Sequence, residues 1–462
     1  MNSMTLAICT VLVVASVPLA DAREVTDIAS SFSIDLKRGN LQQLELDQRG
    51  RLRLSNSDGK YAQTGEFVSA VVDLSSNAAL KGAKTIRVRW VEQWTTPLTW
   101  KKHAMNPVYG PKQSGAWDNW TNGVSVVRTP DDLHYRMFYS GRNGAGIGFA
   151  EAPIDDPFTW KENPASPVLR PRTDNWEGNL LNQPRVVKVT DTHWRMYYTG
   201  WGDRGKPGSA WAFGLAESLD AGLTWKRVGD GEPLLDRGGE GSPDEGGVFV
   251  PEVRRVGDRW MMWYTAMKAV PGKQYIHLCL ATSDDGVHWQ KYEHNPVVSE
   301  DFAAGPGRNV MSRCFVRHEH GVFKMWFSHA RTAYRIRYAE SLDGIDWEHS
   351  PVTPVLGPGA AGDWDSDKVE YPEIDVVDGK YRMWFCGNGY GTVGYAEGVP
   401  EAGVKLHIRS GNIATPDASW SEWKPIQRNV PINAGRYAQI QARLWSRNAK
   451  ISPAVVRVGL TP

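Results

Sequence analysis

The sequence is poor in cysteine and has almost no net charge. It contains 4 cysteines, and its 53 Lys and Arg residues nearly balance 52 Asp and Glu residues. Cys9 lies near the N-terminus, whereas Cys279, Cys314 and Cys386 lie inside strand-like runs. We therefore expect buried thiols rather than a disulfide framework, and no spacing is typical of zinc. The balanced charge provides no basic field, so we expect no nucleic acid among the partners.

The sequence also lacks an apolar run long enough to cross a bilayer. The apolar, uncharged stretch from Thr5 to Leu19 is shorter than a typical membrane span. Ala20-Asp21-Ala22 follows it and is similar to a signal-peptidase site. We predict that residues 1–22 are a signal peptide cleaved near Ala22. The mature protein is then expected to be a secreted or periplasmic monomer without membrane insertion.

What the sequence does contain is one strand motif in five copies. A second strand follows each copy, for example GYAE at 394–397, and the period is 58–66 residues. Several short strands in a repeat of this length predict a five-bladed β-propeller rather than a helical solenoid. The copies are YRMFYSG (135–141), WRMYYTG (194–200), WMMWYTA (260–266), FKMWFSH (323–329) and YRMWFCG (381–387).

A Trp and a Pro-Val or Pro-Leu pair follow the second strand in four of the repeats. The fifth copy of that segment lies upstream, where WKKHAMNPV at 100–108 resembles WQKYEHNPV at 289–297. The outer strand of the last blade is therefore predicted to come from the start of the propeller, which closes the ring. We predict an all-β fold, with a five-bladed β-propeller (98–400) inserted into a β-sandwich made from 23–97 and 401–462. Two independent β caps are the alternative.

One face of such a propeller is expected to hold the functional residues. The innermost strand of each blade lines the axis, and the start of strand one shares a face with the end of strand two. Acidic, basic and aromatic residues collect at these segments, a mixture that suits a carbohydrate. Glu370 breaks the repeat and is the first candidate for a catalytic carboxyl, with Asp118 or Glu245 as the candidate for the second, a general base. The residues aligned with Glu370 are Asn122, Asn182, Phe249 and Ser312.

Other residues of this face are predicted to bind substrate. Asp118 and Glu177 follow a Trp in register, which is also typical of a loop-capping group. Arg313 could bind a hydroxyl or an anionic group, or pair with Glu370, and His329 could be a ligand, a donor or a packed imidazole. The predicted substrate-binding residues are Arg313, His329, Asp244, Asp367, Arg308, Arg142, Trp201, Lys268, Asn388, Glu177 and Asn182.

The repeat resembles the five-bladed propeller glycosidases, the group that includes glycoside hydrolase families 43, 32, 117 and 130. The resemblance covers about 100–398 and rests on RMWF with GYAE, on SLDGIDW with PVL, and on Glu370-Tyr371-Pro372. It implies a glycan or oligosaccharide substrate and general acid/base cleavage with Glu370 as the acid. The chain departs from family 43 where that family carries its other acids, because Gly123, Gln183, Val250, Arg313 and Tyr371 hold those positions.

Three functions stay open at this point. The first is a secreted glycoside hydrolase with relocated acids, and the second is a propeller that binds carbohydrate without cleaving it. The third is a sialidase-like enzyme, because SLDAGLTW at 218–225 matches the Asp-box turn, although sialidases have six blades. No cofactor or metal is predicted, and the sequence does not indicate a structural or central calcium ion.

Overall fold

The computed structural model describes residues 32–462, apart from 97–98, 111–115, 120, 142–143, 203–210, 230–231, 271–272, 300–308 and 389–390. The predicted signal peptide and the predicted ligands Arg142 and Arg308 lie outside the described residues. The elements of the described residues are strands and the short 3-10 turn η1 (Leu74–Ser76), so the prediction of an all-β fold is confirmed. No helix in this part of the chain is long and apolar enough to span a bilayer.

The middle of the chain forms five four-stranded antiparallel units, one for each copy of the repeat. The first strands of successive units contact one another, and β27 contacts β11, so the units close into a ring. β21 and β23 also pair briefly in parallel, which joins the third and fourth units into one sheet.

The strands of the ring are as follows. The first two units contain β11 (Asn122–Arg128), β12 (His134–Ser140), β13 (Ile147–Pro153), β14 (Lys161–Glu162), β15 (Leu181–Lys188), β16 (Trp194–Trp201), β17 (Trp211–Ser218) and β18 (Lys226–Arg227). The other three contain β19 (Gly247–Val256), β20 (Arg259–Val270), β21 (Lys273–Ser283), β22 (Gln290–Lys291), β23 (Asn309–Glu319), β24 (Val322–Ala330), β25 (Tyr334–Ser341), β26 (Glu348–His349), β27 (Glu370–Val377), β28 (Lys380–Cys386), β29 (Val393–Gly398) and β10 (Lys101–Lys102).

The fifth unit takes its outer strand from the beginning of the ring. β10 pairs with β29, with Lys101 opposite Glu397 and Lys102 opposite Ala396. Nearly 300 residues of sequence separate the two strands. This pairing is the closure that the displaced copy at 100–108 predicts, and it leaves no open edge between the last unit and the first.

The core of the ring lies between neighbouring units. The aromatic residue after the repeated Met of the second strand is fully buried in every unit. Trp263 Nε1 donates to the Gly344 carbonyl in the Ser341–Trp347 turn of the next unit, and Tyr197 Oη donates to the Gly286 carbonyl of the corresponding turn. These turns therefore join neighbouring units as well as shaping their own hairpins. The five aromatic residues are Phe138, Tyr197, Trp263, Trp326 and Trp384.

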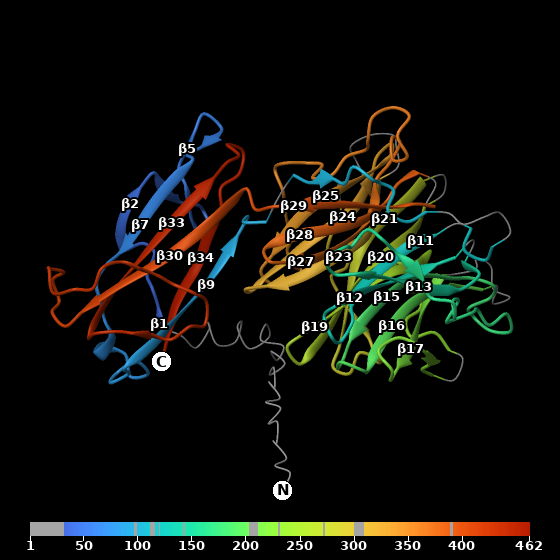
Figure 1. Cartoon of the computed structure of the whole chain (residues 1–462), viewed down its shortest axis with the longest axis horizontal. Helices are drawn as coiled ribbons and strands as arrows, with labels where there is room; N and C mark the ends of the chain where they lie inside the picture. Colours follow the sequence, from blue (N-terminus) through green and yellow to red (C-terminus); the bar gives the residue numbers. More distant parts are fainter. Residues whose placement is uncertain are drawn as a thin grey trace, which may run out of the picture.

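The two ends of the chain combine in a second part, which lies beside the ring (Figure 1). Two six-stranded sheets share one core, with Val88 and Leu460 from the first and Phe67 and Ile440 from the second. The first contains β1 (Phe32–Ser33), β3 (Leu44–Leu46), β4 (Leu52–Leu54), β9 (Thr85–Gln93), β32 (Ile432–Asn433) and β34 (Ala454–Thr461). The second contains β2 (Gly39–Gln42), β7 (Thr64–Ser69), β8 (Val72–Asp73), β30 (Ala402–Gly411), β31 (Lys424–Pro425) and β33 (Tyr437–Ser446), and β5 (Asn56–Ser57) pairs with β6 (Lys60–Tyr61).

Polar contacts join this part to the fourth unit of the ring. Arg51 Nη1 lies 2.7 Å from Glu348 Oε2, and the Trp94 amide donates to Glu340 Oε2 at 2.9 Å. The three cysteines of the described residues are free and buried, as the sequence predicts. The predicted domain boundaries, at 97/98 and 400/401, stay predictions.

Candidate functional site

Every first strand of the ring carries a β-bulge near its start. The bulge residue has a positive φ in each unit, from 22° at Arg313 to 61° at Gly123. Four of these residues have side chains and therefore pay the steric cost of a left-handed backbone. The bulges fall at the positions where the sequence departs from the resemblance to family 43. They are Gly123, Gln183, Val250, Arg313 and Tyr371.

A hydroxyl group of the preceding unit accepts the amide hydrogen of the bulge in four of the five cases. The donor–acceptor distances lie between 2.8 and 3.2 Å. The acceptors are Ser140 for Gln183, Thr199 for Val250, Thr265 for Arg313 and Ser328 for Tyr371. Cys386 holds the fifth position and interacts with the backbone of Gly123. These hydrogen bonds hold the bulges in place, because the backbone amide of a bulge residue has no partner in the β-ladder and finds one here.

The bulge side chains meet across the axis. Arg313 Nη1 donates to Gln183 Oε1 at 2.6 Å, and Gln183 Nε2 donates to Asn122 Oδ1 at 3.1 Å. Arg313 also donates to the Val124 carbonyl, and its guanidinium lies 5.8 Å from the ring centre of Tyr371. Gly123 leaves room for this series of bonds, because a Cβ there would lie 2.1 Å from Gln183 Oε1. Arg313 Nη2 lies 3.7 Å from Glu373 Oε2, a carboxylate that the sequence alternatives for Arg313 did not include.

Glu370 begins the first strand of the fifth unit and lies directly before its bulge. Its register partner on β28 is Cys386, and its carboxylate lies 3.0 Å from Lys368 Nζ. The side chain is fully covered. The pKa of the Cys386 thiol is raised to about 12, chiefly by burial and then by the charge of Glu370. The strand alignment that sets Glu370 apart is correct, because Asn122, Asn182, Phe249 and Ser312 precede the other bulges.

The acids of the loops before the first strands are held by their own units. Glu177 accepts from Arg227 through both oxygens, at 2.6 and 2.7 Å, and from Tyr198 Oη at 2.8 Å. Asp244 accepts from Tyr264 Oη at 3.1 Å and lies 2.6 Å from Lys291 Nζ. A tyrosine of strand two and a cation of strand four thus bind one loop acid. This arrangement indicates a loop-capping role for Glu177 and Asp244, whose carboxylates bind side chains of their own units.

The other candidate acids differ in their surroundings. Asp118 is buried and accepts from Tyr139 Oη at 3.1 Å. Glu245 is half-buried and accepts from the Gly241 amide at 2.6 Å, within its own loop. Asp367 is exposed, and its amide donates to Asn388 Oδ1 at 2.9 Å. Among these three, Glu245 and Asp367 are accessible to a ligand, whereas Asp118 resembles the capped loop acids.

Asn388 and Asn182 mainly bind their own backbone surroundings. Asn388 accepts from the amides of Asp367 and Lys368, so it holds the loop before Glu370. Asn182 Oδ1 accepts from the Gln183 amide at 2.9 Å. Both residues thus hold backbone next to the bulge layer, by which we mean the five bulge residues and their hydrogen bonds.

The other predicted ligands lie at the ends of second strands. His329 is buried opposite Met311 and Arg335 in the strand registers. Lys268 is exposed on β20. Trp201 has 39% of its surface exposed and stacks on Trp211 at a centroid distance of 5.5 Å. Lys268 and Trp201 are therefore accessible, and His329 is packed into its unit.

Sequence reasoning missed an aromatic series that leads from this exposed tryptophan toward the axis. Trp211 stacks on Trp201 and lies 6.2 Å from the ring of Phe249. Phe249 is the residue aligned with Glu370 in the third unit. The sequence offered a signal for this series, because Trp201 ends β16 and Trp211 begins β17, the strand that pairs with it. The two tryptophans lie directly opposite each other in that pair. Such a series offers flat apolar faces against which the C–H face of a sugar can stack.

Sequence reasoning also missed a buried ion cluster two residues beyond the bulges. Arg185 lies 2.6 Å from Glu252 Oε2 and 2.5 Å from Glu373 Oε1. Arg254 lies 2.6 Å from the other oxygen of Glu252. Burial raises the pKa of Glu252, although Arg185 and Arg254 oppose the shift. Within the described residues, no group of three or more His, Cys, Asp or Glu side chains is arranged to hold a metal ion.

Comparisons with known proteins agree with this fold. No family model matches the chain. The uncharacterized protein Rv1502 of Mycobacterium tuberculosis is 28% identical over 321 residues, which cover 66% of this chain and 100% of the relative. A solved complex of BT0996 and RGII superposes with a TM-score of 0.52 at 17% identity, covering 66% of this chain and 92% of the other. A solved glycoside hydrolase gives 0.51 at 16% identity, with the same coverage. The chain therefore has a divergent glycosidase-like propeller fold.

Proposed function

We propose that the protein acts on a glycan or oligosaccharide and cleaves a glycosidic bond with Glu370 as general acid. The observation that carries the proposal is the place of Glu370 in the ring. It is the one carboxylate among the five residues that precede the bulges, and the others are two amides, a phenylalanine and a serine. A residue with a purely structural role would be expected at the same position in the other units, as the loop acids are.

Neighbouring residues complete the proposed site. Lys368 Nζ lies 3.0 Å from Glu370 and favours its carboxylate form, whereas the full burial of Glu370 favours the protonated form that a general acid needs. Asn388 holds the loop that carries Lys368. Gln183 and Asn122 offer polar groups on the axis, and Trp201 offers a stacking face for a sugar ring. Glu245, as the accessible candidate, is the proposed general base, and Asp118 is the second choice. We further propose that the protein is secreted or periplasmic, in line with the predicted signal peptide.

The test is a screen of aryl glycosides and polysaccharides with the wild type, Glu370→Gln and Glu397→Gln. Glu397 lies in the same unit but is exposed on β29, so Glu397→Gln is the matched control. We expect the wild type and Glu397→Gln to release the same product, and Glu370→Gln to be at least about 100-fold slower. Cleavage that survives Glu370→Gln overturns the assignment.

Non-catalytic carbohydrate binding is the second candidate function. The observation in its favour is that two candidate acids, Glu177 and Asp244, are bound by cations and tyrosines of their own units. In that case the wild type releases no product but still binds a glycan on an array. Glu370→Gln then binds the same glycan with unchanged affinity, whereas Trp201→Ala loses it.

A further inference from the structure

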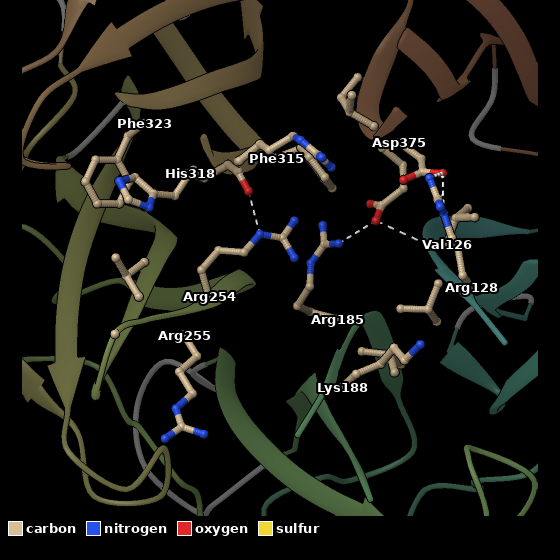
Figure 2. A pocket seen from close by; sticks show the side chains of 18 of the residues that line it. Val126, Arg128, Arg185, Lys188, Arg254, Arg255, Phe315, His318, Phe323 and Asp375 are labelled. Atoms are coloured by element: carbon tan, nitrogen blue, oxygen red, sulfur yellow. Dashed lines mark hydrogen bonds and ion pairs between the residues drawn. The ribbon is translucent and has the colours of Figure 1, made fainter. Parts of the chain in front are cut away.

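A second candidate site lies at the other end of the axis from Glu370. A pocket of about 1050 Å³ opens where the first strands end and their hairpins begin. Its walls come from the later residues of all five first strands, and neither Glu370 nor any bulge residue lines it. Figure 2 shows Arg185 and Arg254 with their guanidinium groups side by side in the middle of the pocket.

The floor of this pocket carries more positive than negative charge. Three guanidinium groups, from Arg185, Arg254 and Arg313, contact two carboxylates, from Glu252 and Glu373. The set therefore has a formal charge of 3 − 2 = +1. A buried charge without a counter-ion is costly. Burial is the main cause that lowers the pKa of Arg254; Arg185 lowers it further, whereas Glu252 and Glu373 oppose the shift.

Arg254 is the most exposed arginine of the cluster. Its side chain is 23% exposed, whereas those of Arg185 and Arg313 are 2% and 1% exposed. Nε donates to the Val316 carbonyl at 2.5 Å, and Nη2 lies 2.6 Å from Glu252. The guanidinium packs on the ring of Phe315 at 4.4 Å. No acceptor among the described residues bonds Nη1, so this group can donate to a ligand.

The rim of the pocket is neutral. Lys188 and Arg255 line it without an ion pair among the described residues, and their cations lie 5.8 and 5.9 Å from the rings of Trp194 and Trp260. Asp132 and Asp258 line the same rim, also without an ion pair in the part of the protein that the structure describes. Two rim cations thus balance two rim acids. The charge at the floor therefore favours one anionic group on an otherwise neutral polar body, rather than a polyanion.

The remaining charged groups of the lining already have partners. Arg128 Nη2 lies 2.7 Å from Asp375 Oδ2, and Arg317 pairs with Glu319. The Asp343 carboxylate accepts two backbone amides of its own turn, at 2.8 and 2.9 Å. These groups are therefore less suited to bind a ligand than Arg254.

We propose that this pocket binds a ligand with a single anionic group, a carboxylate, sulfate or phosphate, and that Arg254 is its principal contact. The anion would supply the counter-charge that the axial cluster lacks, and its bond to Arg254 would be charge-assisted. The rim would contact the neutral part of the ligand. The site is independent of the proposed glycosidase chemistry, because it lies at the opposite end of the first strands.

Thermal unfolding with added anions tests this proposal. The probes are sodium sulfate, sodium phosphate, sodium glucuronate and glucose, each compared with sodium chloride at matched ionic strength. We expect at least one anion, and not glucose, to raise the melting temperature of the wild type in a saturable way. A preference for glucuronate identifies a sugar carboxylate, and a preference for sulfate or phosphate identifies those groups. An equal effect of chloride overturns the proposal.

Variants assign the effect to Arg254. Arg254→Gln leaves two guanidinium groups with two carboxylates, so it is expected to fold, and to bind the same anion at least about 10-fold more weakly. Arg38→Gln removes the same charge from an 81% exposed side chain outside the ring and is the matched control. Arg255→Glu reverses an exposed rim charge and should weaken binding several-fold even if Arg254→Gln does not fold. Unchanged binding in both pocket variants overturns the proposal, whereas Glu370→Gln should bind the anion normally.

Discussion

Neutralising Glu373 tests the charge balance on the propeller axis. Glu373 is 1% exposed, and its Oε1 accepts from Arg185 at 2.5 Å and from the Val126 amide at 3.3 Å. Its Oε2 lies 3.7 Å from Arg313. Glu373→Gln keeps the shape and one acceptor oxygen but removes the charge. Three guanidinium groups then face Glu252 alone, and the formal charge of the cluster rises from +1 to +2.

The expected cost follows from the loss of one partner in a buried ion pair, which is about 3–5 kcal/mol. We expect the lower end, about 3 kcal/mol, because the amide oxygen of Gln can still accept from Arg185 and Val126. For a large domain this lowers the melting temperature by roughly 6 °C. The assay is urea unfolding followed by tryptophan fluorescence, together with a thermal melt, and Glu397→Gln serves as the exposed control.

A double variant distinguishes the effect of the net charge on stability from the effect of side-chain shape. Combining Glu373→Gln with Arg254→Gln leaves two guanidinium groups and one carboxylate, which returns the formal charge of the cluster to +1, so the double variant should be more stable than Glu373→Gln alone. The two changes should therefore be non-additive, as expected for members of one network. The reasoning would be refuted if Glu373→Gln cost less than about 1 kcal/mol, or if the costs of the two substitutions simply added.

Three further predictions concern the bulge layer and the junction of the two parts. Gly123→Ala should cost about 1–3 kcal/mol in thermal or urea unfolding, because its φ is +61° and the new Cβ would lie 2.1 Å from Gln183 Oε1. Ser328→Ala should cost about 1–3 kcal/mol by the same measurement, because it leaves the amide of Tyr371 without its acceptor at 2.8 Å. Burial raises the pKa of Glu340 from 4.5 to about 7, so the folded state keeps a proton that the unfolded state releases. The free energy of unfolding of the wild type, relative to Glu340→Gln, should therefore fall by up to about 3 kcal/mol as pH rises from about 4.5 to about 7. A flat difference across that window would contradict the burial of Glu340 as a carboxylic acid.

The sequence was sufficient to predict the units of the ring and its closure. Both depend on the repeated strand motif, whose copies can be aligned by eye and each carry an aromatic residue that is buried in the structure. The displaced copy at 100–108 predicts that the outer strand of the last unit comes from the start of the ring, and the structure shows that strand paired through Lys101 and Glu397. The alignment across units likewise identifies Glu370 as a departure from the repeat, and the strand registers agree with that alignment.

The bulges and the axial ion cluster could not be predicted from repeated sequence patterns. Gln183, Val250, Arg313 and Tyr371 have positive φ without being glycine or asparagine, so their residue types give no signal for a left-handed backbone. Arg185, Glu252 and Glu373 lie more than 60 residues apart and meet only because the ring closes. The sequence of a single strand therefore does not show why a charged residue stands at any of these positions.

The bulge layer also limits where chemistry can occur. Gln183 and Arg313 occupy bulge positions and bond one another at 2.6 Å, and Gly123 leaves space for that bond. An aspartate at position 123 would collide with Gln183, and one at position 313 would remove the donor of that bond and one of the two arginines that contact Glu373. The side chains at the bulges thus bond one another and leave no room for the acids expected there from the resemblance to family 43. The proposed mechanism therefore uses Glu370, which directly precedes its bulge, as the acid and a loop carboxylate as the base, and Glu245 is the accessible one of the two candidate bases.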